Sequence, residues 1–371
     1  MSRTRLKDVV RQQKSSLKLS DLKKHGAFPV FGASGLVGYR DFFQSEKEAV
    51  AIIKDGAGIG RVSMLPKHSS VLGTMQMLEP KEGISNSYLF YYLSHLKLGK
   101  SFTGSTIPHI YFKNYSDSSF PDVSYNQQCQ VAEKLDAIRK SIEQKSNQLS
   151  ILDSLVKSRF MEMFGEWNLS FQKENWIKLS DLTNIYTGTT PKTEIEEYWN
   201  GLIPWVTPAE LDKDSYLITD TERHITEKGQ KSKSLTMMPI GTVLLSTRAP
   251  IGKVAICGVP MTCNQGFKNF ECLEKLHPTY LFYLLKLNND WLQTQGTGTT
   301  FKEISKSKAG NIRIPVPTMS DQKDFAQFYN LVDKSRFVVH SRYFLWLNFT
   351  FVSSTIAYSR VVSILECPKR C

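Results

Sequence analysis

The feature that most constrains this chain is an internal repeat, in which five short motifs occur twice in the same order. The pairs are Leu17–Leu22 with Ile177–Leu182, Ala57–Val62 with Ala249–Val254, Tyr88–Leu93 with Tyr280–Leu285, Gly104–Thr106 with Gly298–Thr300, and Phe120-Pro121 with Ile314-Pro315. The copies lie 160 to 194 residues apart, whereas solenoid repeats recur every ~20–50 residues. The repeat therefore predicts two homologous domains, and it suggests a partner that itself has two similar halves.

The composition favours a folded protein with an anionic partner. A chain of 371 residues has room for two domains, each with its own core. Lys and Arg exceed Asp and Glu by 12, and the pI is about 9.2. Basic side chains gain affinity for phosphates by releasing counterions. Nucleic acid is therefore the favoured partner, and a basic protein without such a partner is the alternative.

Cysteine usage and hydropathy predict a cytoplasmic protein with no membrane contact. Cys257, Cys263 and Cys272 lack the C-x-x-C spacing and the histidine partners of a zinc site, so we expect reduced thiols in a core. Met1–Lys14 carries charges throughout and has no signal-peptide core. Residues 343–359 are uncharged but rich in Asn, Ser and Thr, which favours a strand-like segment over a membrane span.

Short apolar runs between glycines and prolines predict strands in both copies. They are Leu17–Leu22, Ala49–Ile53, Val62–Leu65, Ile177–Leu182, Thr242–Ser246, Lys253–Ile256 and Asn311–Pro315. Apolar residues at helical spacing predict helices at Tyr88–Leu96 and Pro278–Leu287. The fold class is therefore α/β or α+β, in two domains at residues 16–125 and 166–320. Residues 1–15 have no match in the second copy and form an atypical N-terminal segment.

A long helix is predicted between the domains, over residues 126–165, because this stretch lacks proline and its apolar residues alternate at intervals of three and four. The heptad seam, interrupted by Lys145, consists of Val131, Leu135, Ile138, Ile142, Leu149, Leu152 and Val156. One narrow apolar stripe requires a partner helix. That helix is expected in residues 321–371, after Gln322, with Phe325, Phe328 and Val332, but its heptads stop after about residue 339.

The sequence holds no recognisable catalytic constellation. Phosphate-binding, metalloprotease and nucleophile-elbow motifs are absent from it. Gly56–Gly60 fits a tight turn between strands better than a nucleotide-binding loop. The paired carboxylates Glu196-Glu197 fit a solvated loop. We therefore expect no catalytic, cofactor-binding or metal-binding residues in this chain.

Candidate DNA contacts are hydroxyl and basic residues in the repeated glycine loops and in the stretches where the copies differ. Exposed amides and hydroxyls beside lysines suit phosphate contacts, although an ordinary solvated turn explains them equally well. Basic side chains in the divergent stretches are candidates for phosphate or guanine contacts. The candidates are Arg40, Lys54, Arg61, Ser105, Thr106, Lys113, Thr189, Thr190, Lys192, Arg248, Lys253, Thr299, Thr300 and Lys302.

Several segments together resemble the specificity subunit of type I restriction–modification systems, over roughly residues 16–337. Phe28–Gly35 with Gly38-Tyr39 is similar to the opening of one class of target recognition domain, and Gly188–Pro191 with Tyr198–Trp205 is similar to the opening of another. Phe120-Pro121 with Gln128, and Ile312–Pro317 with Gln322, resemble the exit from each domain into its spacer helix.

The resemblance implies two target recognition domains held apart by two antiparallel spacer helices with pseudo-two-fold symmetry. Each domain would read one half of a split sequence in double-stranded DNA, and the helices would set the gap. The chain itself would not be an enzyme. Two modification subunits would methylate adenine with S-adenosylmethionine, and restriction subunits would use ATP and Mg²⁺ for translocation and cleavage. The segment after about residue 339 and Met1–Ser15 depart from the family pattern.

Two other interpretations remain open at this stage. The chain could be a fragment of a fused DNA methyltransferase or nuclease, although it lacks the motifs of either class. It could also be a non-catalytic coiled-coil scaffold, which the helix at 126–163 supports. A scaffold does not explain the duplicated α/β domains. Neither the target bases nor the length of the gap can be derived from the sequence, because a few side chains on loops determine base readout.

Overall fold

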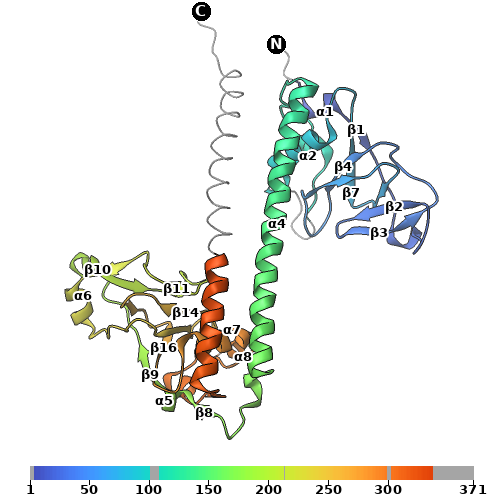
Figure 1. Cartoon of the computed structure of the whole chain (residues 1–371). Coiled ribbons are helices and arrows are strands. Elements are labelled where there is room, and N and C mark those ends of the chain that lie inside the picture. Colours follow the sequence, from blue (N-terminus) through green and yellow to red (C-terminus); the bar gives the residue numbers. More distant parts are fainter. Residues whose placement is uncertain (1–3, 101–107, 213, 299–301, 337–371) are drawn as a thin grey trace, which may run out of the picture. The chain divides into compact units, whose positions relative to one another are not determined.

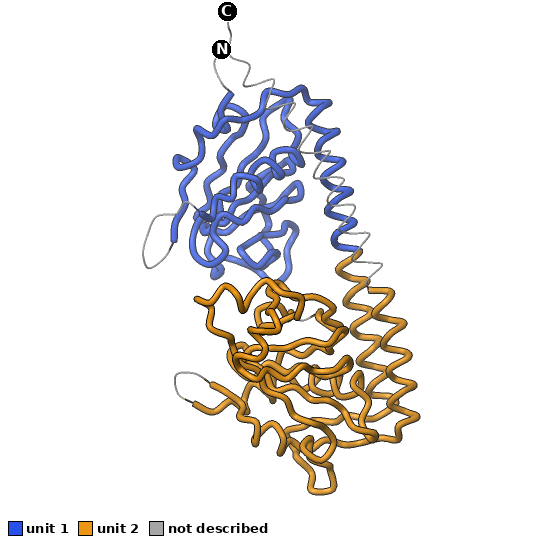
Figure 2. The backbone as a smooth tube through the Cα atoms, turned by 90° about the vertical axis from the view of Figure 1, so that its left-hand side faces the viewer, with its two compact units in different colours: residues 1–144 blue, residues 145–371 orange. Residues whose placement is uncertain are grey.

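The computed structural model describes residues 4–100, 108–212, 214–298 and 302–336. It divides into two compact units, unit 1 at residues 1–144 and unit 2 at residues 145–371 (Figure 2). A single helix, α4 (Tyr125–Phe164), begins in unit 1 and ends in unit 2. The predicted spacer helix is therefore confirmed as one continuous element, with bounds within two residues of those expected.

Unit 1 is built on two sheets. The larger has the order β1 (Val10–Gln13), β7 (Met75–Pro80), β4 (Ala49–Ile53), β5 (Val62–Leu65), and all its strand pairs are antiparallel. The smaller contains β3 (Gly35–Arg40), β2 (Phe28–Gly32) and β6 (Ser70–Val71). Its helical elements before α4 are α1 (Leu6–Val9), η1 (Leu19–Asp21), α2 (Asn86–His95), η2 (Leu98–Lys100) and α3 (Phe112–Tyr115).

Unit 2 repeats this plan with more strands. Its larger sheet has the order β11 (Leu217–Ile218), β14 (Val254–Cys257), β13 (Val243–Ser246), β16 (Phe267–Cys272), β9 (Thr183–Thr187). Its three-stranded sheet contains β12 (His224–Ile225), β10 (Trp199–Val206) and β15 (Thr262–Cys263), and β8 (Ile177–Lys178) pairs with β17 (Arg313–Ile314). The helical elements are η3 (Leu169–Phe171), α5 (Leu179–Leu182), η4 (Glu196–Tyr198), α6 (Glu227–Ser232), α7 (Pro278–Leu287), α8 (Asn289–Thr294), α9 (Lys306–Gly310) and a helix at residues 319–336.

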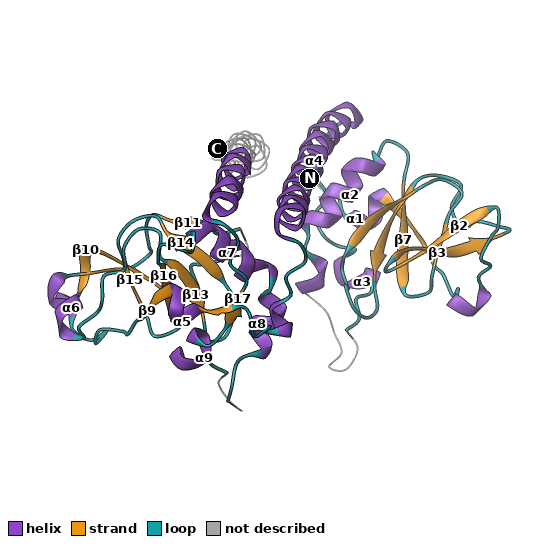
Figure 3. Ribbon diagram, turned by 60° about the horizontal axis from the view of Figure 1, so that its bottom comes forward, coloured by secondary structure: helices purple, strands orange, loops and turns teal. Residues whose placement is uncertain are grey.

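The burial of β4 and α7 explains why these segments form their elements. All five residues of β4 are buried, because the strand lies between β5 and β7 and is short, apolar and β-branched. Helix α7 begins with Pro278 at its first position and is capped by His277, whose Nδ1 accepts a hydrogen bond from the Thr279 N–H at 3.2 Å. Most of α7 is buried against β13 and β14, and α2 packs in the same way against β4 and β5. Figure 3 shows these helices against their sheets.

The predicted duplication is confirmed, but one of its five motif pairs is wrong. In unit 2 the first strand of the larger sheet is β9, which follows helix α5. In unit 1 the first strand of the larger sheet is β1, which follows helix α1. The Leu6 N–H donates to the Ser118 carbonyl at 2.9 Å, and the Leu179 N–H donates to the Ile312 carbonyl at 2.8 Å. Residues 4–9 are therefore the counterpart of residues 177–182. We expected the segment at 1–15 to be foreign to the repeat, but its described residues 4–15 begin unit 1, and Leu6 is completely buried there.

The remaining element predictions agree with the structure to within a few residues, with two exceptions. Leu17–Leu22 contains the 3₁₀ turn η1 instead of a strand, and Ile177–Leu182 is a two-residue strand followed by α5. Strands β4 and β5 and helix α7 have the predicted bounds. The mixed fold class is confirmed in both units. The pseudo-two-fold arrangement of the units stays a prediction.

The predicted seam of α4 is only partly correct. Val156 is fully buried and Leu152 packs against the same core, whereas Leu135, Ile138, Ile142 and Leu149 are half-buried and Val131 is 42% exposed. In unit 2 the core face of α4 consists instead of Val156, Phe160 and Phe164. Their interval of four places them on one side of the helix, and heptad spacing alone did not identify the two aromatic residues.

The second predicted helix lies beside the C-terminal half of α4 in unit 2 (Figure 1). It begins at residue 319, and Phe325 and Val332 are buried as expected, with Phe328 packed against the same core. Tyr329 is buried as well. Arg336 forms an ion pair with Asp153 of α4 that links the two helices. The expected loss of heptads after residue 339 lies outside the described residues.

One buried glutamine anchors the first turn of a long helix in each unit, by the same three hydrogen bonds. Gln128 Oε1 accepts from the Ser85 N–H at 2.9 Å, and its Nε2 donates to the carbonyls of Val123 at 3.0 Å and Gly83 at 3.3 Å. Gln322 Oε1 accepts from the His277 N–H at 2.8 Å, and its Nε2 donates to the carbonyls of Pro317 at 2.9 Å and Lys275 at 3.0 Å. This shared clip ties the helix to the loop before α2 or α7.

The sequence also predicted reduced thiols in a core and no membrane span. Cys257 and Cys263 are buried free thiols, and burial raises the pKa of Cys263 to about 12. Cys272 is half-buried, and burial also raises its pKa to about 12. Among the described residues, no group of three or more His, Cys, Asp or Glu side chains is arranged to hold a metal ion. None of the helices in that part of the chain combines the length and the hydropathy needed to cross a membrane.

Candidate nucleic-acid interface

In unit 2, hydrogen bonds join four loops that carry most of the candidate DNA contacts. Thr190 Oγ1 donates to Gln265 Oε1 at 2.7 Å, which ties the loop after β9 to the loop between β15 and β16. The neighbouring Gly266 carbonyl accepts from the Thr247 N–H at 2.7 Å. The Thr247 carbonyl in turn accepts from the Ile304 N–H at 3.0 Å. The loops at 188–192, 247–252, 264–266 and 302–304 therefore form one connected surface.

Arg248 in this surface belongs to an ion-pair network. Its Nε donates to Glu303 Oε2 at 2.8 Å, and Lys268 Nζ donates to Glu303 Oε1 at 3.1 Å. The Lys268 side chain is only 6% exposed, and a buried ammonium group requires such a partner. Burial alone would raise the pKa of Glu303, but the hydrogen bonds from Lys268 and Arg248 outweigh it and hold the pKa below its ordinary value. Glu303 is therefore ionised at neutral pH.

Hydrogen bonds in unit 1 join three loops that correspond to loops of unit 2, and they add the tip of the β2–β3 hairpin. Arg61 donates to the Ala33 carbonyl, which links the loop between β4 and β5 to the tip of the β2–β3 hairpin. The N–H groups of Lys54 and Asp55 both donate to the Thr74 carbonyl, at 3.0 and 3.3 Å. Asp55 Oδ1 lies 2.7 Å from His109 Nδ1. The loops at 53–61, 73–74 and 108–111 correspond to those at 247–252, 264–266 and 302–304, and together with the hairpin tip at 32–35 they form one connected surface of this unit.

Some candidate residues form hydrogen bonds within the protein, and others lie away from these loops. Lys253 Nζ donates to the Pro208 carbonyl at 2.8 Å, so its charge is partly satisfied internally. The carbonyls of Thr189 and Lys192 accept hydrogen bonds from the indoles of Trp205 and Trp199, each at 3.1 Å, and these bonds fix the loop between them.

Arg40 does not join the unit 1 surface. It pairs with Phe28 at the end of the β2–β3 hairpin opposite its tip, and its guanidinium group lies 3.9 Å from the centre of the Phe42 ring. Lys113 lies on α3 with its ammonium group 5.8 Å from the centre of the Tyr111 ring, and Tyr111 stacks on His109 of the surface. Ser105, Thr106, Thr299 and Thr300 lie outside the described residues.

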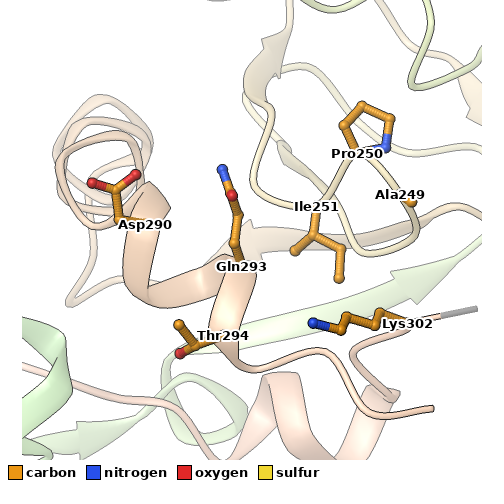
Figure 4. Close-up of a pocket in the computed structure, with 7 residues that line it drawn as sticks. All are labelled: Ala249, Pro250, Ile251, Asp290, Gln293, Thr294 and Lys302. Carbon is orange, nitrogen blue, oxygen red and sulfur yellow. The ribbon is translucent and has the colours of Figure 1, made fainter. Parts of the chain in front are cut away.

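Lys302 borders an open hollow of about 460 Å³ in unit 2 (Figure 4). Its side chain extends between Ile251 and the helix that carries Gln293 and Thr294. The lining residues are Ala249, Pro250, Ile251, Asp290, Gln293, Thr294 and Lys302. The hollow is open and mostly apolar, and it adds shape to the surface beside Arg248.

Sequence reasoning missed the acidic, amide and imidazole residues of both surfaces. Glu303, Gln265, Asp55 and His109 were not candidates, because the search favoured basic and hydroxyl side chains. One signal was available for Gln265: it follows Asn264 and precedes Gly266, a composition that is typical of a turn. The pairing of Arg248 with Glu303, 55 residues later, has no local signal.

Comparison with known proteins agrees with this architecture. The model of the type I restriction modification DNA specificity domain matches residues 2–150 and again residues 173–337. The MjaIX type I restriction enzyme specificity subunit of Methanocaldococcus jannaschii is 39% identical over 184 residues, which cover 48% of this chain and 43% of that protein. The EcoR124I/EcoR124II specificity subunit of Escherichia coli is 24% identical over 262 residues, 66% of this chain and 63% of its own length.

A solved structure shares the fold. The S subunit of a type I restriction–modification system from M. genitalium superposes with a TM-score of 0.62 at 16% identity, over 100% of this chain and 96% of that one. The alignments with the two curated relatives cover less than two thirds of each relative's length. The two family matches together span most of the sequence, and one match lies mainly in each unit. The chain therefore belongs to the family of type I restriction–modification DNA specificity proteins.

Proposed function

We propose that this chain is the DNA-recognition subunit of a type I restriction–modification assembly, in which each unit reads one half of a split target. The observation that carries the proposal is the recurrence of one set of connected loops, with basic side chains, in two units of the same fold. Two unequal half-sites require two similar scaffolds that differ in the side chains on their loops. The net charge of +12 supports a polyanionic partner.

The remaining chemistry belongs, in this proposal, to partner subunits. Two modification subunits would bind S-adenosylmethionine and methylate adenine, and restriction subunits would bind ATP and Mg²⁺. This chain would bind none of these cofactors and would supply only the target sequence and the gap. Helix α4 supports the second role, because a continuous helix of 40 residues is a stiff spacer.

Two alternative functions predict different behaviour of the purified chain. A fragment of a fused methyltransferase or nuclease would transfer methyl groups or cleave DNA by itself. A coiled-coil scaffold would show no sequence preference in DNA binding. The recurrence of the loop surfaces in both units favours the recognition subunit over the scaffold.

Exchanging one unit tests the proposal. We expect a chain whose residues 170–320 come from a relative with a different target, expressed with its modification subunits, to methylate DNA with one half of the target changed. The other half and the methylation level should stay the same, because the loops of each unit are joined within that unit. Methylome sequencing reads both halves at once. A change in both halves together would contradict the independent reading of half-sites.

A further inference from the structure

Each unit carries a pair of one acidic and one basic side chain at the same place in the fold, but the acidic residue lies on opposite sides of the pair in the two units. In unit 1 the pair is Asp55 and His109, and in unit 2 it is Arg248 and Glu303. Each pair spans an isolated antiparallel bridge between the loop after the central strand, β4 or β13, and the segment before the last short helix, α3 or α9. The acidic residue of one unit therefore stands where the other unit has arginine.

Backbone hydrogen bonds establish that these positions are equivalent. The N–H of Ile110, the residue after His109, donates to the carbonyl of Lys54, the residue before Asp55, at 2.9 Å. The N–H of Ile304, the residue after Glu303, donates to the carbonyl of Thr247, the residue before Arg248, at 3.0 Å. The reversal of charge is therefore a difference between the units at a fixed backbone position.

A third position changes together with the pair. Ile52 of β4 pairs with Gln76 of β7, and Leu245 of β13 pairs with Lys268 of β16. Lys268 is buried and donates to Glu303. Gln76 is also buried but neutral, and it bonds to Gln12 and Gln13 in the neighbouring strand. Among the residues that the structure describes, the carboxylate is therefore held from two sides in unit 2 and from one side in unit 1.

Because Glu303 is held in place, the guanidinium group of Arg248 is fixed but still accessible. Its side chain is 48% exposed, and the bond to Glu303 uses the Nε atom. A guanine is read by two parallel donors of an arginine in one plane, and a carboxylate bound to Nε orients that plane. The other candidates of the loops differ: Arg61 and Lys253 donate to backbone carbonyls of the protein, and the lysine ammonium group has no planar pair of donors.

We infer that Arg248 is a specificity-determining residue that reads a guanine in the half-site of unit 2, with Glu303 as its positioning residue. The inference rests on the proposed function and names the base class that one residue recognises. Asp55, at the same position in unit 1, has only acceptors when ionised, so it does not read the O6 and N7 acceptors of a guanine as an arginine does. Two half-sites of different sequence need different side chains at equivalent positions of the two units, and Asp55 and Arg248 are such a difference.

The test is the methylome of cells that contain the modification subunits and the full-length chain, either wild type or variant. In Arg248→Ala, one guanine of one half-site should become degenerate, with discrimination at that base reduced about 10- to 100-fold, while the other half-site is unchanged. Arg248→Lys should show the same degeneracy, because it keeps the charge and loses the planar pair of donors. If Arg248→Lys retains full selectivity, Arg248 contacts phosphate only and the inference is wrong.

Glu303→Gln tests the positioning role, and Lys302→Ala is the matched control on the neighbouring residue. Glu303→Gln should relax the same guanine as Arg248→Ala, with a smaller effect. Lys302→Ala should lower the methylation of all sites uniformly, as a phosphate contact does. Melting temperatures of the purified variants check folding, and Arg248→Lys at an exposed position keeps the test valid if Glu303→Gln unfolds.

Different results would contradict the proposed function and the inference about Arg248. If the wild-type complex methylates no split sequence, the proposed function fails. If it methylates one but every Arg248 variant keeps that sequence, or the half-site of unit 2 has no guanine, only the inference about Arg248 fails.

Discussion

Replacing Phe160 with alanine is expected to lower the free energy of unfolding of unit 2 by about 3–5 kcal/mol, the usual cost of removing a buried aromatic side chain. Phe160 is 1% exposed. Its ring centre lies 4.9 Å from that of Phe164, 5.2 Å from those of Tyr283 and Phe325, and 5.8 Å from that of Tyr280. One side chain of α4 therefore contacts both α7 and the helix at 319–336. Urea unfolding followed by tryptophan fluorescence measures the change, since Trp167 stacks on Phe164.

Ile151→Ala is the matched control for Phe160→Ala. Ile151 lies on the same helix within unit 2 and is 65% exposed, so its replacement should change stability by less than about 0.5 kcal/mol. Equal losses in the two variants would show that burial in the core of unit 2 does not determine the stability of this part of α4.

Replacing Gln322 with leucine is expected to cost about 2–4 kcal/mol, although leucine is apolar and similar in size. Gln322 is fully buried, and its removal leaves the His277 N–H and the carbonyls of Lys275 and Pro317 without their partner. Each buried group that loses its hydrogen bond costs about 1–3 kcal/mol. Gln128→Leu should destabilise unit 1 by a similar amount, because Gln128 makes the same three bonds there.

Gln327→Leu serves as the control for the glutamine variants. Gln327 lies on the same helix as Gln322 and is exposed, so its replacement should be close to neutral. Urea midpoints of the variants provide the comparison. A Gln322→Leu protein as stable as Gln327→Leu would show that the three hydrogen bonds contribute no net stability.

The duplication could be predicted from sequence because both copies need the same buried elements in the same order. Each of these elements has a local signature in the sequence. The central strand is a run of apolar residues, the helix that packs on it has apolar residues at helical spacing, and the buried glutamine follows a proline at the end of the domain. The pairing of Leu17–Leu22 with Ile177–Leu182 failed although these hexamers are nearly identical. The better counterpart, residues 4–9, shares only the Leu and Asp positions, and its role depends on a hydrogen bond to Ser118 that lies far away in sequence.

The candidate site was predictable only as a set of loops. Glycine and proline mark the loops, and net charge indicates the partner. Arg248 and Lys54 lie in such loops, and their contacts with DNA stay a prediction. What each basic group binds within the protein was not predictable. Arg61 donates to Ala33, and Arg248 pairs with Glu303, across sequence separations of 28 and 55 residues. Such contacts depend on how the chain folds back, and no local pattern encodes them.

The equivalence of the two units can be tested with the chain's own sequence. Ser124 and Thr318 occupy the same position before the long helices, since their carbonyls accept from the N–H groups of Gln128 and Gln322 at 2.9 and 3.1 Å. A chain in which residues 177–318 replace residues 4–124 therefore keeps the backbone register at its junction with α4. The decisive measurement is the methylome of cells that express this chain with its modification subunits. If each unit reads one half-site, the methylated sequence should contain the half-site of unit 2 twice, inverted about the gap. A methylated sequence that keeps the original half-site of unit 1 would contradict the account.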